Sequence, residues 1–219
     1  MFVYSLSGLS LAADDAGGPV EVEENETTAR SAVYQWLGRV FTAPDVDHFE
    51  RARDGRWAKE LAAAAGGLPY AFDVPLAELP AEVDQQSYEA AFAAALDGRV
   101  LGGAYGGGDR ERALEDIHRA YEYFGLTASD RGLPPDHLVS ECDYLQYLTF
   151  REAAVSSDRL RRSYRRAQLE FLDQHLVWTS ALAAESDGPD RLAFIGWAAL
   201  LLASFVVADA AYVRELVGG

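Results

Sequence analysis

The chain has 219 residues, enough for one globular domain with a substantial core, and 49% of them are hydrophobic, an ordinary share for a folded protein. Its 35 acidic residues oppose 19 basic ones, so the formal net charge is -16 at pH 7. Such a surface repels phosphate backbones and disfavours nucleic-acid binding. The single cysteine, Cys142, excludes an internal disulfide and a multi-cysteine metal site.

The basic residues are almost all arginines, because Lys59 is the one lysine. An acid excess with almost no lysine is similar to the composition of halophilic proteins, whose acidic surfaces stay hydrated at high salt. We favour this interpretation. An acidic protein from a GC-rich mesophile is the alternative, since alanine, glycine, arginine and aspartate are also abundant.

Residues 1–28 are expected to form an acidic, partly mobile N-terminal arm, and residues 29–219 one domain. Residues 14–19 have a linker composition, and 21–26 form an acidic run. Residues 1–13 are apolar but carry no lysine or arginine before the apolar run, so they do not fit a secretory signal. Thr27 and Thr28 are the expected N-cap residues of the first helix.

Apolar residues recur with helical spacing along the rest of the chain, and no convincing strand pattern is present. The first helix places five apolar residues on one face: Val33, Trp36, Leu37, Val40 and Phe41. Further helices are expected over residues 46–65, 84–96, 110–124, 138–155, 158–184 and 189–216. A glycine-rich loop is expected over 98–108. The pattern predicts an all-α, single-domain helical bundle.

Residues 192–208 contain no charged side chain. A membrane-spanning helix usually needs about 20 such residues, and Arg191 and Asp209 bound this shorter run. We therefore expect a buried core helix, with a membrane span as the alternative.

The segment Leu133-Pro134-Pro135-Asp136-His137-Leu138-Val139-Ser140-Glu141 is the most informative in the chain. Two prolines hold the backbone extended, and Asp136 follows as a favoured N-cap residue for a helix. His137 and Glu141 are four residues apart, so they share one face of that helix.

This segment resembles the Pro-x-Asp-His-x-x-x-Glu signature of the TorD/DmsD/NarJ family of cytoplasmic chaperones for molybdenum-containing redox enzymes. Four more segments resemble family helices in the same order: Ala29-Arg30-x-x-x-Tyr34-x-x-Leu37-x-x-Val40-Phe41-x-x-Pro44, Tyr88-x-x-x-Phe92, Tyr121-x-x-Phe124-Gly125-Leu126 and Phe171-Leu172-x-x-His175-Leu176-x-x-Thr179. The resemblance implies a TorD-like helical domain and suggests a haloarchaeal member. One departure is the glycine-rich run 102–108, where relatives often carry a Pro-rich aromatic segment and where Tyr105 stands in for the aromatic residue.

The resemblance also implies a peptide-binding site for the twin-arginine leader of a client enzyme. Its expected residues are Asp136, His137, Glu141, Pro134, Tyr88, Phe92 and Tyr105. A carboxylate can bind a guanidinium bidentately, and aromatic side chains can receive the apolar part of a leader. The alternatives are that Asp136 only caps the helix, that His137 satisfies a local carbonyl, that Glu141 is a buried or solvated acid, and that Tyr88 and Phe92 are plain core.

The function implied is a chaperone without enzymatic activity, cofactor or bound metal. It would bind the leader and the immature catalytic subunit of a molybdopterin oxidoreductase of the dimethyl-sulfoxide-reductase type, and assist cofactor insertion before export. We expect a cytoplasmic monomer or weak homodimer without stable membrane insertion. Two alternatives are a metal-dependent hydrolase using Asp136, His137 and Glu141, and a helical protein anchored in a membrane by residues 192–208.

Overall fold

α-Helices account for most of the chain in the computed structural model, which describes residues 19–75, 79, 82–96, 98–105, 110–126, 133–186 and 193–218. The described elements are α1 (Pro19–Val40), α2 (Val46–Arg53), α3 (Arg56–Ala65), α4 (Gln85–Leu96), the 3-10 turn η1 (Gly102–Ala104), α5 (Arg110–Tyr123), α6 (Leu138–Ala154), α7 (Asp158–His175), α8 (Thr179–Ser186) and α9 (Ala193–Gly218). The predicted all-α fold is confirmed.

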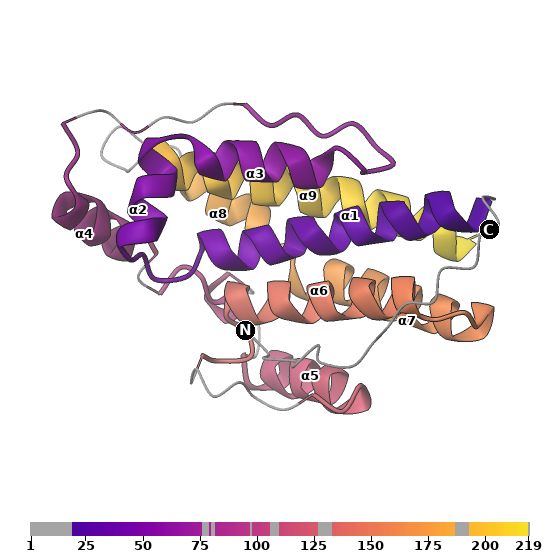
Figure 1. The fold of residues 1–219 in the computed structure, drawn as a ribbon. Coiled ribbons are helices and arrows are strands. Elements are labelled where there is room, and N and C mark those ends of the chain that lie inside the picture. Colours follow the sequence, from indigo (N-terminus) through magenta and orange to yellow (C-terminus); the bar gives the residue numbers. More distant parts are fainter. Residues whose placement is uncertain are drawn as a thin grey trace.

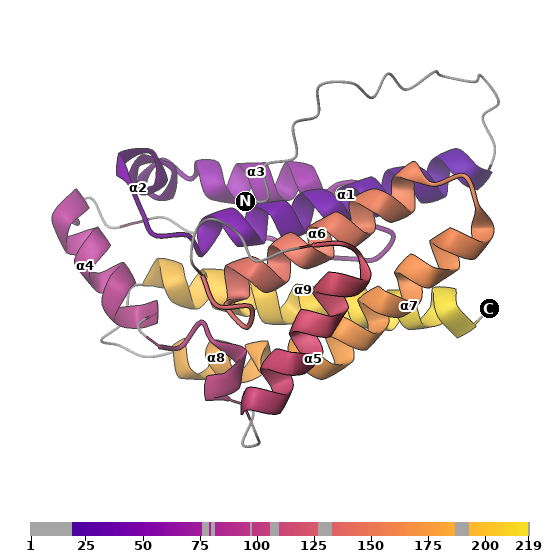
Figure 2. The ribbon, with the colours of Figure 1, turned by 90° about the horizontal axis from the view of Figure 1, so that it is seen from below.

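The long helices lie roughly along one another, and α1 has its most extensive contact with α6 (Figure 1). α1 also packs on α3, and α9 packs on α7 and α8. α5 lies at the outer edge, beyond α6 and α7, while α4 extends from the end of the bundle near α2 (Figures 1 and 2). Two faces of α6 are therefore covered by α1 and α7. Its first turn lies close to α5 and to the segment that contains η1, at the periphery of the bundle.

The start of α1 differs from the prediction. The helix begins at Pro19, so Thr27 and Thr28 lie inside it and do not cap it. Proline suits the first turn of a helix, where its missing N–H has no partner to lose. Residues 1–18 of the predicted arm lie outside the described residues, and the arm's mobility stays a prediction. The predicted apolar face is buried as expected: Val33, Trp36, Leu37, Val40 and Phe41.

Two predicted helices are each divided in two. The helix expected over 46–65 breaks at Gly55, whose φ of 72° is a left-handed conformation that glycine adopts readily. The helix expected over 158–184 ends at His175, and α8 begins at Thr179. The Thr179 hydroxyl donates to the Leu176 carbonyl at 2.8 Å, which stabilises this break.

α9 is, within the part of the chain that the structure describes, the one helix long and apolar enough to cross a membrane by length and composition. Buried core helices of soluble proteins have the same properties. In this structure α9 packs against α7 and α8 and contributes Phe205 and Asp209 to the interior, while Leu200 and Val207 point outward. Its position is that of a core helix.

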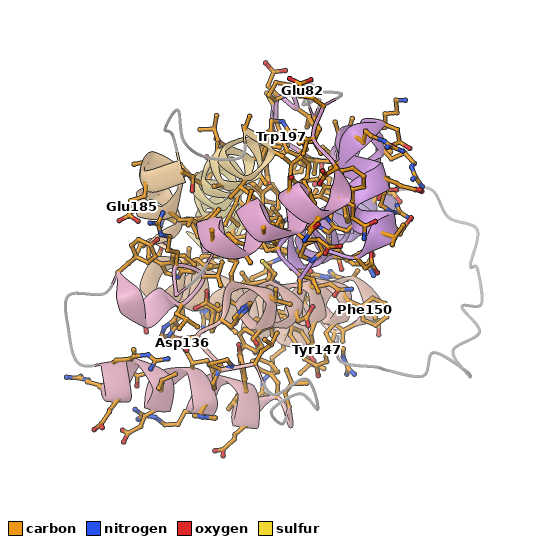
Figure 3. The ribbon with its side chains drawn as sticks, turned by 90° about the vertical axis from the view of Figure 1, so that its left-hand side faces the viewer. Glu82, Asp136, Tyr147, Phe150, Glu185 and Trp197 are labelled. Carbon is orange, nitrogen blue, oxygen red and sulfur yellow. The ribbon has the colours of Figure 1, made fainter. Side chains whose placement is uncertain are left out.

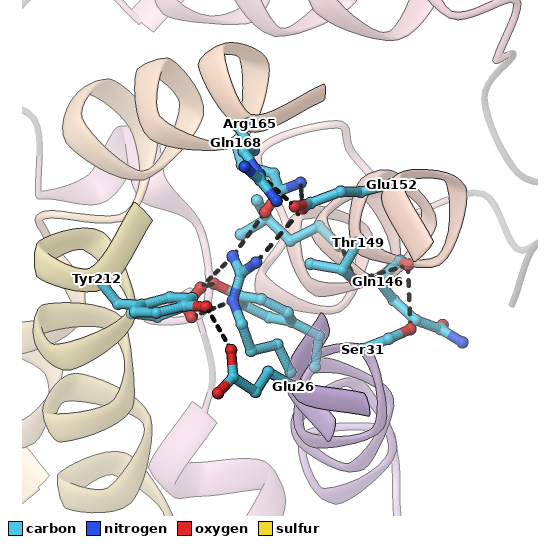
Figure 4. Close-up of polar contacts among 12 residues, drawn as sticks. Glu26, Ser31, Gln146, Thr149, Glu152, Arg165, Gln168 and Tyr212 are labelled. Carbon is cyan, nitrogen blue, oxygen red and sulfur yellow. Dashed lines mark hydrogen bonds and ion pairs between the residues drawn. The ribbon is translucent and has the colours of Figure 1, made fainter. Parts of the chain in front are cut away.

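A buried polar network, which we call the Arg30 network, joins four helices (Figure 4). The fully buried Arg30 of α1 binds Asp209 of α9 through Nε at 2.5 Å and Nη2 at 3.0 Å. Its Nη2 also donates to Gln168 of α7 at 2.6 Å, and Nη1 lies 3.4 Å from Glu152 of α6. Burial alone would lower the pKa of Arg30, but Asp209 and Glu152 outweigh it and hold the pKa above its usual value.

The acids of the network have further partners. Arg165 and Gln168 donate to Glu152 at 2.6 and 2.8 Å. Tyr34 and Tyr70 donate their hydroxyls to Asp209 at 2.6 and 2.8 Å. Two arginines thus balance two carboxylates, and the hydrogen bonds offset the cost of removing the charges from water.

We predict that Arg30→Met strongly destabilises the fold, because it leaves Asp209 and Glu152 buried with an excess of negative charge. Removing one partner of a buried pair typically costs about 3–5 kcal/mol. Arg214→Met is the matched control: Arg214 and Asp173 form an exposed pair at 2.7 Å, and exposed pairs contribute about 1 kcal/mol or less. Urea denaturation measures both, and equal losses in the two variants would contradict a structural role for the network.

Candidate functional site

Asp136 lies on a turn that is fixed from two sides at the start of α6. The Gly102 N–H donates to the Asp136 carbonyl at 2.9 Å, and the Leu138 N–H donates to the Val100 carbonyl at 2.8 Å. Leu101 and His137 thereby form an isolated antiparallel bridge. From the other side, the Tyr121 hydroxyl of α5 donates to the Pro135 carbonyl at 3.1 Å. Neighbouring backbone and a side chain of α5 therefore set the position of the Asp136 carboxylate.

The Asp136 side chain is 1% exposed and is held by Arg110, the first residue of α5. Arg110 Nε donates to Oδ2 at 3.0 Å, and Nη2 donates to Oδ1 at 3.1 Å. The Gly103 N–H lies 3.3 Å from Oδ2. This is a bidentate arrangement, the geometry in which a carboxylate binds a guanidinium most strongly. Asp136 lies between α5 and the body of the bundle (Figure 3).

Two glycines allow this close packing. A Cβ at Gly103 would lie 2.6 to 2.7 Å from Cγ, Cδ and Nε of Arg110, so the arginine side chain lies directly against the Gly103 backbone. A Cβ at Gly102 would lie 2.9 Å from Nε1 of Trp178 and 3.2 Å from Oε1 of Glu141. A side chain at Gly102 would therefore press on Trp178 and Glu141, and one at Gly103 would displace Arg110 from its present position.

His137, and not Asp136, is the N-cap of α6. The Val139 N–H donates to Nδ1 of His137 at 3.1 Å, so the neutral ring carries its proton on Nε2. Burial lowers the pKa of His137 despite the nearby Asp136, which agrees with a neutral ring. The predicted capping role of Asp136 is wrong because its carboxylate is turned toward Arg110 and Gly103.

Glu141 is fully buried one turn into α6, and neither carboxyl oxygen has a hydrogen bond of normal geometry among the described residues. The indole N–H of Trp178 lies close enough to the carboxyl group to favour its charged form slightly. Burial, and then the charge of Asp136, raise the pKa of Glu141 well above its usual range. This environment favours the neutral form of the acid, and an approaching cation would favour the charged form.

Aromatic side chains border this acid. The ring of Tyr105 stacks on Trp178 with centroids 5.2 Å apart and an interplanar angle of 14°. The Tyr105 hydroxyl donates to Glu185 at 3.3 Å. The structure therefore brings Pro134, Asp136, His137, Glu141 and Tyr105 into one region. We call it the Asp136 corner and include Gly102, Gly103, Arg110 and Trp178 in it.

Tyr88 and Phe92 lie elsewhere, on α4, and both are buried. The Tyr88 hydroxyl lies 3.0 Å from Nδ1 of His48, and both rings contact the His48 ring. The Tyr88 ring also contacts Phe92 and Phe194. In this structure they occupy core positions, as the simpler alternative for an aromatic stripe expects. Neither ring lines an open surface.

The three residues of the hydrolase alternative do not converge as metal ligands. Asp136 is bound to Arg110, Nδ1 of His137 accepts a backbone hydrogen bond, and Glu141 is fully buried with a raised pKa. Within the described ranges, no three histidine, cysteine, aspartate or glutamate side chains gather so that they could hold a metal ion.

Comparison with known proteins places this chain in a family. The sequence pattern of the nitrate reductase delta subunit family matches residues 58–184, which are more than half of the chain. The chain belongs to this family. The resemblance to TorD/DmsD/NarJ proteins is thereby confirmed.

Two family relatives have names that describe a role. The chain is 29% identical to the perchlorate reductase assembly chaperone protein of Dechloromonas aromatica (strain RCB) over 177 residues, 74% of this chain and 79% of that protein. It is 42% identical to the selenate reductase assembly chaperone protein of Thauera selenatis over 71 residues, 31% of this chain and 36% of that protein.

The sequence did not reveal two residues of the Asp136 corner. Arg110 lies within the family-matched residues, but it is the first residue of α5 and stands 26 positions before Asp136. No local sequence pattern links the two residues. The helical pattern predicts one continuous helix over residues 158–184, whereas Trp178 falls in the break between α7 and α8. The one sequence feature that points to an acidic partner for Arg110 is its place at the start of α5, because a helix N-terminus disfavours an unpaired positive charge.

We predict that Glu141→Gln becomes more stable relative to the wild type as pH rises. Above the ordinary glutamate value of 4.5 the unfolded wild type releases this proton while the folded protein keeps it, so wild-type stability falls. The difference should grow by at most about 1.4 kcal/mol per pH unit until the folded pKa is passed. Urea denaturation from pH 5 to 8 measures it. The exposed Glu215→Gln is the control, and a difference independent of pH would show that Glu141 is ionised in the fold.

Proposed function

We propose that this protein is an assembly chaperone for the catalytic subunit of a molybdopterin oxidoreductase of the dimethyl-sulfoxide-reductase type. Its family and the names of two relatives support this proposal. The observation that carries it is the Asp136 carboxylate, which is fixed by backbone hydrogen bonds and already binds a guanidinium in bidentate geometry. The role is to hold the immature subunit and assist cofactor insertion before export.

The ligand of the Asp136 corner is the client's twin-arginine leader. One arginine binds Asp136. The second lies beside Glu141, which is buried in the free protein and ionises once the corner opens and the cation arrives. His137 and Pro134 keep the turn in place, and the half-buried ring of Tyr105 offers an apolar surface beside it. Tyr88 and Phe92 take part only if α4 moves, because both rings are buried here.

We further propose that the protein acts in the cytoplasm as a monomer or weak homodimer, without nucleic acid and without stable insertion in a membrane. The net charge of -16 argues against a polyanionic partner and favours a cationic leader. The buried Asp209 of α9, bound to Arg30, argues against that helix leaving the core for a bilayer. The work is binding, and it requires no covalent step.

We predict that Asp136→Asn weakens binding of a synthetic leader peptide that carries two adjacent arginines and an apolar stretch. The substitution keeps the shape but removes the charge, and losing one partner of a desolvated charged contact should lower affinity by about tenfold or more. Isothermal calorimetry measures the dissociation constant, with circular dichroism to verify the fold.

The control is Asp173→Asn, which removes the same charge from an exposed pair on α7. It should leave the affinity within about twofold, because exposed charges contribute little at moderate salt. If the two variants lose affinity equally, the leader is attracted by net charge alone and the Asp136 corner is not its site.

A further inference from the structure

Arg110 stands where a ligand arginine would have to bind. Its guanidinium makes both hydrogen bonds that the Asp136 carboxylate offers to a bidentate partner, at 3.0 and 3.1 Å. Asp136 is 1% exposed, whereas the Arg110 side chain is 47% exposed. The carboxylate is therefore covered by the side chain that binds it, and another guanidinium can reach it only after Arg110 moves.

The surroundings of Arg110 fit an arginine side chain closely, but the side chain that fills them is half exposed. The absence of a Cβ at Gly103 gives room to Cγ, Cδ and Nε of Arg110. Arg110 is also the first residue of α5, where the helix dipole repels a positive charge. The half-exposed guanidinium can swing into water, but Asp136 is 1% exposed, so Arg110 leaves it chiefly in exchange for another guanidinium.

We propose that Arg110 is an internal occupant of the leader's arginine site, which it closes in the free protein and leaves when the leader binds. This inference rests on the proposed function and adds a regulation to it. Arg110 neutralises Asp136 most of the time while no client is present, so the buried carboxylate is seldom left unpaired. Client arginines must compete with Arg110 for Asp136, which lowers the apparent affinity for every peptide. Peptides that carry a single cationic side chain are then disfavoured against the twin-arginine leader.

The competition has a measurable size. If Arg110 closes the site about nine-tenths of the time, the apparent affinity for a leader is reduced about tenfold. Arg110→Ala should therefore bind the twin-arginine peptide about three- to tenfold more tightly than the wild type. Arg110→Lys should fall between them, because an ammonium cannot reproduce the guanidinium fork.

Arg119→Ala is the matched control. Arg119 is an exposed arginine on the same helix, paired with Asp116, and its loss changes the net charge equally. Any gain in peptide affinity in Arg119→Ala measures the general attraction of a more acidic protein for a cationic peptide. The proposal requires Arg110→Ala to exceed this gain, and fluorescence anisotropy with a labelled peptide at fixed salt measures all four proteins.

Affinity in Arg110→Ala equal to that in Arg119→Ala, or weaker than in the wild type, would overturn the proposal while leaving leader binding intact. A peptide that binds none of the proteins, wild type included, would instead remove the proposed function and this inference together. If Arg110→Ala does not fold, the Arg110→Lys comparison decides. The wild type supplies a second test by NMR: the Arg110 Nε–H resonance should shift when peptide is added, and an unchanged resonance at saturating peptide would refute displacement.

Discussion

Arg30 is fully buried and contacts acids or amides on three other helices, so its position links α1, α6, α7 and α9. Such a network stabilises the fold only when every charge has a partner, because an unpaired ion in the interior is strongly unfavourable. Asp209 and Glu152 supply the negative charges, and Arg165 supplies the second positive one. Any other packing of these four helices would break several contacts of the network at once and leave buried charges unpaired.

α6 connects this network to the proposed site. Glu152 binds Arg30 and Arg165 near the C-terminal end of the helix, and the Asp136 corner lies at its N-terminal end. The central part of α6 is buried beneath α1 and α7. A rigid helix anchored at both ends presents the Asp136 carboxylate in a fixed direction, which a site that recognises a guanidinium by geometry requires. The peripheral partner, Arg110, is the half-exposed part of the site and the part that we propose to move.

Local patterns in the sequence were sufficient for the helical fold and for the Asp136 turn, because periodicity and proline act over a few residues. Local patterns did not predict the features that depend on contacts between residues far apart in the sequence. Arg30 lies on the same helix face as Val33 and Leu37, yet its burial depends on Asp209, which the sequence presented only as the end of an apolar run. Arg110 and Asp136 meet through tertiary packing. The break before Thr179 likewise depends on a hydroxyl contact that no helical period predicts.

The crystal structure of the protein with a bound twin-arginine peptide tests the central claim most directly. We expect a peptide guanidinium bidentate on Asp136, the Arg110 side chain turned away from it, and the Arg30 network unchanged. A peptide bound elsewhere on the surface, with Arg110 still on Asp136 at the distances of the free protein, would contradict the account.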